Sequence, residues 1–432
     1  MLDWLIHDIA WNIAKILMIV VPLMGAVAYL TLAERKVIGY IQMRIGPNRV
    51  GPGGLLQPFA DGLKNIVKEE TYPRRANSIF FVLAPMLSIG PALLTFAVVP
   101  FAAPLPTPWG LVDLIIADVS IGMLFILALS SLGVYGLVMA GWSSNSKYAF
   151  LGGMRASAQM VSYEIGLGMS LVPVFMLTGD VTLTGAVWVQ QEGLGLWFAF
   201  PLSVAFVLFI LSAFAETNRL PFDMPEAESE LVTGYHTEYS SMKFSMFFIA
   251  EYAHVLTVSA LMATLFLGGW DIPFWQGDNM RVIGPGIVQG AEPAWWKSIL
   301  TFGAFTAKTL FFVFVFMWVR WTVPRFRYDQ IMDLGWKIVL EAITVFILLV
   351  GAEILVLDAM GLEFGFLYGL ILTVLNFGAL ALLMFVLDSN RIIGGSARRS
   401  VTRRPVGRRI ETREKADAEP VMAGTGTPEG KP

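Results

Sequence analysis

Charged side chains placed inside long apolar stretches are the residues of this sequence best suited to chemistry. Five residues have such positions: Glu164, Glu251, Lys308, Glu341 and Glu353. A charge in an apolar span is costly, so it usually pairs, faces the interior of a bundle or lines a wet path. For any one residue a buried ion pair or a neutral carboxyl explains the position equally well, but five together favour a proton or ion pathway. Glu341 and Glu353 lie nearer the ends of their stretches and count for less.

Glu251 and His254 are three residues apart, so they share one face of a helix and could exchange a proton. The alternative is an interior histidine whose ring is simply hydrogen bonded. The chain has only three histidines and no cysteine. We therefore expect no metal site, no thiolate-bound iron–sulfur cluster and no haem in this chain.

An acidic loop is the second candidate site. Its sequence, AETNRLPFDMPEAESELVTGYHTEYS, spans residues 215–240 and sets six acids against Arg219: Glu216, Asp223, Glu226, Glu228, Glu230 and Glu238. Clustered carboxylates repel one another, so we expect some of them to hold protons more tightly than an isolated carboxylate does. A solvated acidic loop is the usual alternative. Interleaved apolar residues such as Leu220 and Phe222 favour packing instead, and a packed acidic loop can switch when a nearby charge changes.

Other catalytic signatures are absent from the sequence. It contains no P-loop and no dinucleotide fingerprint after a strand. The basic, glycine-rich segment MRIGPNRVGPGG lacks the spacing of a phosphate-binding loop. Its glycines and prolines predict tight turns that hold Arg44 and Arg49.

Apolar helices must position these residues. Of the 432 residues, 56% are hydrophobic and 15% charged, against about 25% charged in soluble domains. Stretches of about 20 apolar residues can cross a bilayer core of about 30 Å as helices. We therefore predict an all-α, polytopic membrane helix bundle of about nine spans: 16–33, 79–101, 119–140, 156–178, 196–215, 244–270, 298–319, 338–357 and 364–387.

Lysine and arginine set the expected orientation. They concentrate in the loops after the first, third, fifth and seventh spans, whereas Arg281 and Lys297 are the clear exceptions in the other loops. Basic loops stay in the cytoplasm, so the N-terminus is expected outside and the C-terminal tail inside. The N-terminus, with Asp3 and Asp8 and no basic start, does not have the pattern of a cleaved signal peptide.

Two further segments shape the predicted organisation. Within residues 55–70, the apolar side chains of Phe59, Leu63 and Ile66 recur at helical spacing. This pattern suits either an amphipathic helix at the membrane interface or an ordinary surface helix. Residues after Asp388 become rich in Arg, Gly, Pro and Glu. We therefore predict a transmembrane domain over 1–390 and a basic, disordered cytoplasmic tail over 391–432.

Four segments resemble the H-subunit family of type I NADH–quinone oxidoreductases (respiratory complex I). They are AERKVIGYIQMRIGPNRVGPGGLLQPFADGLKNIVKEE (33–70), GWSSNSKYAFLGGMRASAQMVSYEIG (141–166), SAFAETNRLPFDMPEAESELVTGYHTEYSSMKFSMFFIAEYAH (212–254) and RWTVPRFRYDQIMDLGWK (320–337). The resemblance covers most of the predicted inner surface. It implies a bacterial inner-membrane subunit that joins the membrane arm to the peripheral arm of the complex and forms most of a quinone-access chamber.

The resemblance also implies roles for residues. Glu34, Arg35, Arg44, Asp61, Arg155 and Phe222 would line or support the quinone chamber. Glu164, Glu216, Asp223, Glu226, Glu228, Glu230, Glu238 and Glu251 would relay protons or respond to quinone chemistry. Arg219, Arg325, Arg327 and Asp329 would have structural or interface roles.

Partners and cofactors follow from the same resemblance. Quinone, either ubiquinone or menaquinone, would be the substrate. Flavin and iron–sulfur clusters would be held by other complex I subunits, so this chain would have no complete catalytic site of its own. The implied partners are those subunits and membrane lipid, with no nucleic acid.

The sequence departs from the family in places and leaves alternatives open. Asn65 stands where the family often has a bulky apolar residue, and the ninth span with the basic tail extends past a shared core of eight spans. The intramembrane charges would also suit a stand-alone secondary transporter, although no inverted repeat is visible. The membrane subunit of an energy-converting hydrogenase shares the GP-x-x-x-GP and LLQP region, but the acidic loop fits the NADH–quinone enzyme better.

Overall fold

The computed structural model describes residues 2–107, 110–224, 231–273, 275–284 and 287–388. Three predicted site residues, Glu226, Glu228 and Glu230, and the predicted tail lie outside the described residues. The compact unit Met1–Ala379 contains all of the bundle discussed below, and residues from Leu380 onward form a second unit.

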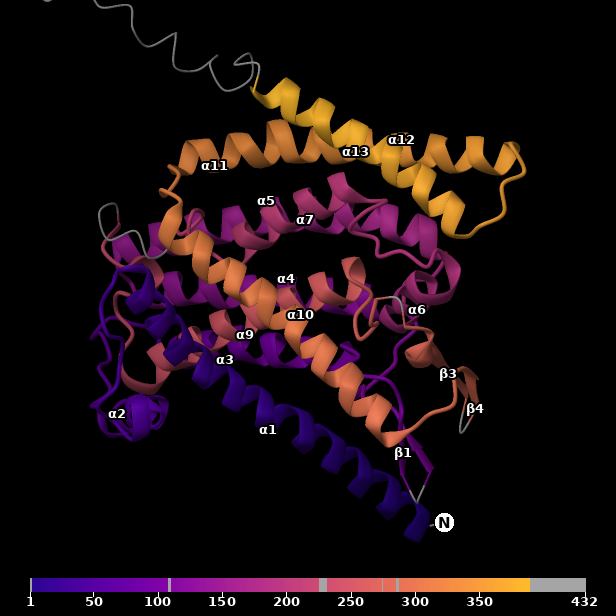
Figure 1. Cartoon of the computed structure of the whole chain (residues 1–432). Helices are drawn as coiled ribbons and strands as arrows, with labels where there is room; N and C mark the ends of the chain where they lie inside the picture. Colours follow the sequence, from indigo (N-terminus) through magenta and orange to yellow (C-terminus); the bar gives the residue numbers. More distant parts are fainter. Residues whose placement is uncertain (1, 108–109, 225–230, 274, 285–286, 389–432) are drawn as a thin grey trace, which may run out of the picture. The chain divides into compact units, whose positions relative to one another are not determined.

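Long apolar helices dominate the described residues, as predicted (Figure 1). They are α1 (Leu2–Ile41), α3 (Ser78–Leu94), α4 (Gly122–Ser143), α5 (Lys147–Thr178), α9 (Ser241–Phe266), α10 (Trp295–Thr322), α12 (Leu340–Ala359) and α13 (Phe366–Asp388). Within the described residues, eight helical segments are long and apolar enough to cross a membrane. The chain is therefore a polytopic helical membrane protein.

One predicted span is shorter than the others. The stretch 196–215 contains α7 (Ser203–Glu216), which has only 14 residues. At 1.5 Å per residue it is about 21 Å long, less than the hydrocarbon core of about 30 Å. Backbone turns continue it on both sides, and the turn at its C-terminal end carries Arg219.

Short elements join the long helices. They include α2 (Gln57–Val67), α6 (Leu183–Trp188) and α11 (Tyr328–Leu334), with single turns of 3-10 helix at Pro52–Gly54, Thr95–Val98, Gly234–His236 and Gln276–Asp278 and of π-helix at Val189–Gly193 and Gly335–Val339. Two antiparallel hairpins, which the sequence patterns did not predict, pair β1 (Leu105–Thr107) with β2 (Gly110–Val112) and β3 (Met280–Gly284) with β4 (Ile287–Gly290). Figure 1 shows the hairpins at one end of the bundle, the hairpin end, and α2 at the opposite end, the loop end.

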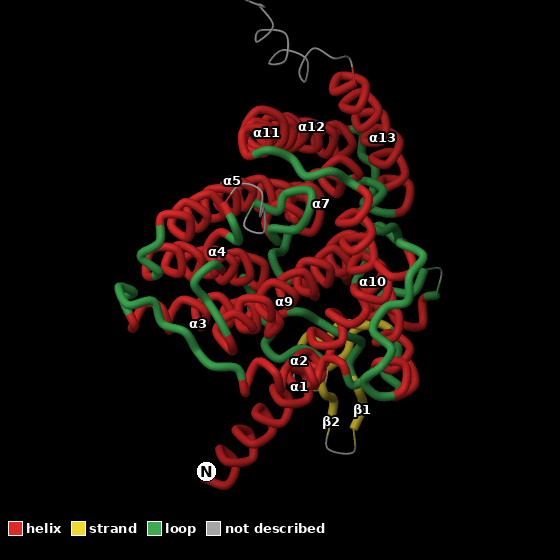
Figure 2. The backbone as a smooth tube through the Cα atoms, turned by 90° about the vertical axis from the view of Figure 1, so that its left-hand side faces the viewer, coloured by secondary structure: helices red, strands yellow, loops and turns green. Residues whose placement is uncertain are grey.

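Both views show the helices of this unit stacked in one order, from α12 through α5 and α4 to α3 and α9, with α1 beyond them (Figure 2). Small residues permit the close packing of α3, α4 and α5. A Cβ on Gly136 of α4 would lie 2.9 Å from the carbonyl oxygen of Ala84 on α3. A Cβ on Gly152 of α5 would lie 2.5 Å from the Cα of Gly234, so α5 also touches the backbone of the acidic loop.

The second half of the acidic loop is anchored in the core. Tyr235 and Tyr239 are buried in the cluster that includes Phe81 of α3 and Phe247 of α9. The rings of Phe81 and Tyr239 stack with their centroids 4.1 Å apart. The packed alternative for this loop is therefore correct for the described residues 231–240.

Candidate functional site

A buried charge cluster joins three helices to the acidic loop. It consists of Glu34 on α1, Arg219 after α7, Glu251 and Tyr252 on α9, and Arg320 on α10. The Tyr252 hydroxyl donates to Oε2 of Glu34 at 2.5 Å, and Nη1 of Arg320 donates to Oε1 of the same carboxylate at 2.7 Å. Both oxygens of Glu34 are therefore engaged, which places a predicted quinone-chamber residue inside an ion-pair network.

Arg219 connects the two carboxylates of this cluster. Its Nε lies 2.7 Å from Oε1 of Glu251, and its Nη1 lies 3.8 Å from Oε2 of Glu34. The guanidinium also lies over the Tyr252 ring, 4.3 Å from the centroid. Two carboxylates and two guanidiniums balance in charge, which offsets the cost of taking them out of water.

Glu216 forms a second polar centre at the end of α7. It is 3% exposed, and its Oε1 accepts a hydrogen bond from the hydroxyl of Ser130 on α4. Nε2 of His254 lies 3.4 Å from that same oxygen. The structure therefore directs His254 toward Glu216, while Glu251, the partner expected from helical spacing, pairs with Arg219.

The neighbouring serine, Ser131, hydrogen bonds to a different carboxylate. Ser131 donates its hydroxyl hydrogen to Oε1 of Glu164 on α5. Consecutive residues of α4 thus touch carboxylates on α7 and α5, two of the predicted coupling residues.

A cavity of about 70 Å³ lies between the two polar centres. Its wall includes Glu216, His254, Glu251, Ser130 and Asn218. A site needs about 10–15 Å³ of this kind of volume and several polar partners to hold one water molecule. The cavity, which we call the Glu216 cavity, is therefore large and polar enough for a few waters that would connect Glu216 with Glu251.

Gln159 of α5 fixes the start of the acidic loop. Its side-chain nitrogen lies 2.7 Å from the carbonyl oxygens of both Ala215 and Phe222. The next residue, Asp223, is buried and accepts a hydrogen bond from Nη2 of Arg325 at 2.9 Å. The loop is thus held both through its backbone, by Gln159, and through the carboxylate of Asp223, by Arg325.

His236 lies in the anchored half of the loop, outside the membrane-spanning helices. Its ring is surrounded by Tyr235, Phe244, Phe247 and Phe248, with ring centroids 4.0 to 6.1 Å away. Burial lowers the pKa of His236 from 6.5 to about 3, because the charged imidazolium would lose its water there. The imidazole is therefore neutral at physiological pH.

Other predicted residues lie on the surface of the loop end. Arg35 of α1 bonds Asp61 of α2 at 2.7 Å, and Arg44 bonds Gln42 through its Nε at 2.7 Å. Arg155 lies 5.5 Å from the centroid of the Tyr328 ring. These contacts join α1 to α2 and α5 to the start of α11.

The remaining predicted residues form no part of the buried site. Arg327 and Asp329 pair at 3.3 Å with both side chains mostly exposed, so the pair adds little stability. Glu238 is half-buried and makes no ion pair within the described residues.

Three of the five intramembrane charges, Lys308, Glu341 and Glu353, lie outside the charge cluster. Lys308 donates to the carbonyl oxygens of Leu267, Gly269 and Asp271 at 2.6 to 3.0 Å, just beyond the end of α9. A cation that satisfies the carbonyls at a helix C-terminus is a cap. Glu341 is exposed, and Glu353 accepts a hydrogen bond from Asn376 of α13 at 3.0 Å.

The sequence patterns did not single out Ser130, Gln159, Tyr252 or Arg320 as site residues. Ser130, Gln159 and Tyr252 are uncharged, and Arg320 lies at the end of a span, where a basic residue is common. The available signal was location, because Gln159 and Tyr252 stand inside apolar helical stretches beside candidate acids. Across the described ranges, no group of three or more His, Asp or Glu side chains could hold a metal ion.

Comparison with known proteins agrees with these motifs. The family model described as NADH dehydrogenase matches residues 14–351. The H subunit of NADH-quinone oxidoreductase from Magnetococcus marinus is 47% identical over 350 residues, which cover 81% of this chain and 93% of the relative. This chain belongs to the H-subunit family of NADH-quinone oxidoreductase. The H subunits from Paramagnetospirillum magneticum and Rhodospirillum centenum are 49% and 48% identical, over 79% and 80% of this chain and 92% and 94% of their own.

Membership of the H-subunit family confirms the resemblance found in the sequence. It also argues against the stand-alone transporter and hydrogenase alternatives. The family match ends at residue 351, so α13 lies beyond it. Every residue of the charge cluster lies inside the matched range.

Proposed function

We propose that this chain is the complex I membrane subunit that forms the quinone-access chamber and couples quinone reduction to proton translocation. The observation that carries the proposal is the charge cluster with the adjoining Glu216 cavity, since it joins the chamber-side residue Glu34 to coupling residues on α7 and α9. Electrons from NADH would arrive through flavin and iron–sulfur groups of the peripheral-arm subunits. The chain contributes the quinone chamber and the coupling path but not a complete catalytic site.

The loop end would form the chamber and face the cytoplasm. The apolar side of α2 is open, with Phe59, Leu63 and Ile66 between 63% and 66% exposed, which suits a helix in the membrane interface. The Arg35–Asp61 pair would hold α2 against α1 at the entrance. Arg44, Arg155 and Phe222 complete the proposed chamber residues.

The hairpin end would then face the periplasm, with the N-terminus of α1 on that side. This orientation rests on the concentration of lysine and arginine in the loop-end segments. It places the chain in the bacterial inner membrane with the acidic loop on the side of the peripheral arm. The bilayer itself and the other complex I subunits are the proposed partners.

Coupling would begin with a change of charge in the chamber. Quinone reduction takes up two electrons and two protons, and the reduced quinone carries negative charge until the protons have reached it, so the charge near Glu34 and Arg219 would change transiently during turnover. Arg219 pairs with both Glu34 and Glu251, so a shift in its position changes the field at α9. Waters in the Glu216 cavity would carry the proton between Glu251 and Glu216, and Ser130 and Ser131 orient Glu216 and Glu164 for the next transfers.

The acidic loop is the part proposed to respond to this change. Asp223 is tied to Arg325, and Glu226, Glu228, Glu230 and Glu238 follow it in the same loop. Arg327 and Asp329 would lie at the junction with the peripheral arm. A protonation change in this loop biases its packing because the loop is anchored at Gln159 and at Tyr235.

The decisive test replaces Glu216 by Gln in inverted membrane vesicles. Electron transfer from NADH to ferricyanide reports on the peripheral arm alone, and NADH-driven quinone reduction with proton uptake reports on the complete path. We expect Glu216→Gln to keep ferricyanide reduction and to lower coupled proton transport by about tenfold or more, as expected for losing a positioned proton carrier. Asp333→Asn, which changes an exposed acid of α11 at the same end that pairs with Lys337 on the surface, is the matched control and should leave both activities unchanged.

Full proton stoichiometry in an assembled Glu216→Gln complex would exclude Glu216 from the path. Ser130→Ala refines the test because it removes the hydroxyl that orients Glu216 without removing the carboxyl. We expect an intermediate loss in coupled transport that Ser130→Thr, which restores a hydroxyl, largely reverses.

A further inference from the structure

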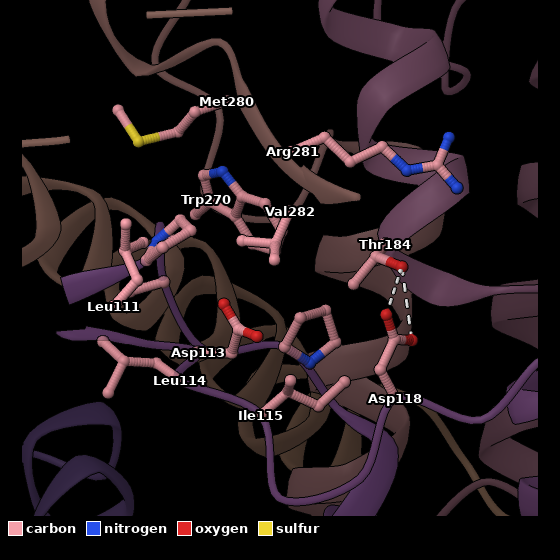
Figure 3. Close-up of a pocket in the computed structure, with 13 residues that line it drawn as sticks. Leu111, Asp113, Leu114, Ile115, Asp118, Thr184, Trp270, Met280, Arg281 and Val282 are labelled. Atoms are coloured by element: carbon pink, nitrogen blue, oxygen red, sulfur yellow. Dashed lines mark hydrogen bonds between the residues drawn. The ribbon is translucent and has the colours of Figure 1, made fainter. Parts of the chain in front are cut away.

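A large polar cavity lies at the hairpin end and shares no residue with the charge cluster. Its volume is about 390 Å³, within the range of small-molecule sites. Figure 3 shows the Asp113 carboxylate below Trp270, with Asp118 and Thr184 on the other side of the space and Arg281 above them. The proposed quinone chemistry uses none of these side chains.

The charge of this polar cavity favours a cation. Thr184 donates to Asp118, at 3.3 Å from each carboxylate oxygen, but a hydroxyl neutralises no charge. Arg281 also lies in the wall, 3.4 Å from Asp180, and its charge acts on Asp118 as well, so one guanidinium faces the two carboxylates of the cavity. Burial raises the pKa of Asp113 and of Asp118, so both carboxylates lie in surroundings that do not fully compensate an anion.

The wall also contains an unsatisfied donor. Trp270 is 5% exposed, and its indole N–H has no acceptor within the described residues. A buried indole N–H normally finds an acceptor. A ligand that suits this cavity therefore combines a cationic group for the carboxylates with an oxygen that can accept from Trp270.

A second, apolar cavity lies on the other side of a thin wall. It has a volume of about 380 Å³ between α1, α9 and α10. Leu114 lines both cavities, Phe101 lines the apolar one, and Pro100 and Ala102 line the polar one. The backbone N–H of Phe101 donates to the carbonyl oxygen of Leu114 at 3.1 Å, so the wall is two hydrogen-bonded segments.

The apolar cavity is open to the bilayer. Met18 of α1 and Phe302 and Leu310 of α10, all in its wall, are 69%, 50% and 54% exposed. These side chains lie in membrane-spanning segments, where the surrounding medium is hydrocarbon. An acyl chain is therefore the chemistry that fits this cavity.

We propose that one phosphatidylethanolamine molecule binds in both cavities and passes around the outer edge of the wall between them, with an acyl chain between α1 and α10 and its ammonium group at Asp113 and Asp118. The primary ammonium supplies three N–H donors to the two carboxylates. The phosphate or ester oxygens supply the acceptor that Trp270 lacks. Phosphatidylglycerol lacks the ammonium, and the trimethylammonium of phosphatidylcholine has no N–H to donate.

The test measures lipid retained by the intact, tagged complex after extended washing in mild detergent, by mass spectrometry of the extracted lipid. We expect the wild type to retain phosphatidylethanolamine and Asp113→Asn/Asp118→Asn to retain about tenfold less, as loss of a charge-assisted contact predicts. Ala26→Phe, which fills the apolar cavity from α1, should reduce retention similarly. Asp333→Asn, on α11 at the loop end, is the control and should match the wild type.

Two further arms identify the source of the ligand. Wild-type complex is exchanged into nanodiscs of phosphatidylethanolamine, phosphatidylcholine or phosphatidylglycerol, and its thermal midpoint is measured. Higher stability in phosphatidylethanolamine alone supports the proposal, and this arm stands even if the variants fail to assemble. Equal stability in all three lipids, unchanged retention in the Asp113→Asn/Asp118→Asn variant, or displacement of the lipid by free phosphoethanolamine at equal concentration would overturn it.

Discussion

The side-chain nitrogen of Gln159 on α5 lies 2.7 Å from the carbonyl oxygen of Phe222 in the acidic loop, and it donates a hydrogen bond to it. The same nitrogen lies 2.7 Å from the carbonyl oxygen of Ala215. One amide on a membrane helix thus ties the end of α7 to the loop that follows it. This anchoring would allow the proposed response at Asp223 to reach the bundle.

Replacing Gln159 by Leu should loosen this loop. Each of the two carbonyls keeps a backbone donor, from Asn218 and Met224, so the change removes two hydrogen bonds worth about 0.5–1.5 kcal/mol each, and the backbone of 217–224 should open more often. Hydrogen exchange of the assembled complex, followed by mass spectrometry, should show faster exchange in that segment than in the wild type. Ser162→Ala, which removes a hydroxyl from the same helix, is the control, and unchanged protection in Gln159→Leu would argue against the anchoring role.

Among the residues of the charge cluster, Arg219 should be the one whose substitution destabilises the complex most. Its removal leaves Glu34 and Glu251 buried with less compensation, and breaking a buried pair costs about 3–5 kcal/mol. We expect Arg219→Ala to lower the amount of assembled complex and its thermal midpoint. Adding Glu251→Gln should recover part of the loss, whereas additive effects of the two changes would show that the residues do not interact.

Lys308 should behave as a cap and not as a proton carrier. Lys308→Met removes the donor shared by three carbonyl oxygens beyond α9, so the thermal midpoint should fall by several degrees, for a loss of about 1–3 kcal/mol. The complex that assembles should keep its ratio of protons to electrons. A normal midpoint with a lowered ratio would mean that Lys308 takes part in coupling after all.

His236 should make the protein sensitive to acid. Its pKa is lowered from 6.5 to about 3 on folding, so between these values the unfolded chain binds a proton that the folded chain does not. The contribution of neutral His236 is complete above pH 6.5 and is lost as the pH falls below it, by about 1.4 kcal/mol per pH unit. His236→Phe, which suits the aromatic surroundings, should lose less stability than the wild type between about pH 7.5 and 5.5.

Buried carboxyls must be considered in the same experiment. Burial raises the pKa of Asp278 from 3.8 to about 6, which gives stability that is lost as the pH rises through this range. Its effect opposes that of His236, but it is the same in the wild type and in His236→Phe. The difference between the two thermal midpoints therefore isolates His236, and a difference that is constant with pH would contradict the assignment.

Sequence patterns predicted the membrane class and the positions of the long helices because apolar length alone sets both. They also singled out Glu251, a charge inside an apolar span, and Glu216 in the acidic loop, whereas Glu34 came from the family resemblance. They did not predict the ion pairs: Arg219 meets Glu34 across 185 positions because the segment after α7 reaches both α1 and α9, and no local spacing indicates that contact. The same limit hid the neutral residues Ser130 and Gln159, whose importance comes from the groups they face.

Lys308 shows the same limit. A lysine inside an apolar helix was expected to pair or to lie on a charge pathway, and the sequence did not show that its ammonium faces three backbone carbonyls just beyond the end of α9. The two hairpins were missed because each strand has only three to five residues, too few for an alternating pattern to be recognised.

The shortness of α7 has a consequence for the electric field across the membrane. Because this helix covers only about 21 Å of a hydrocarbon core of about 30 Å, we expect the turn that carries Arg219 to lie within the depth of the core. Polar side chains at that depth would make the insulating layer locally thinner than the bilayer around it. A membrane potential would fall over this shorter distance, and a proton moving between Glu251 and Glu216 would experience a steeper gradient than one crossing the lipid nearby.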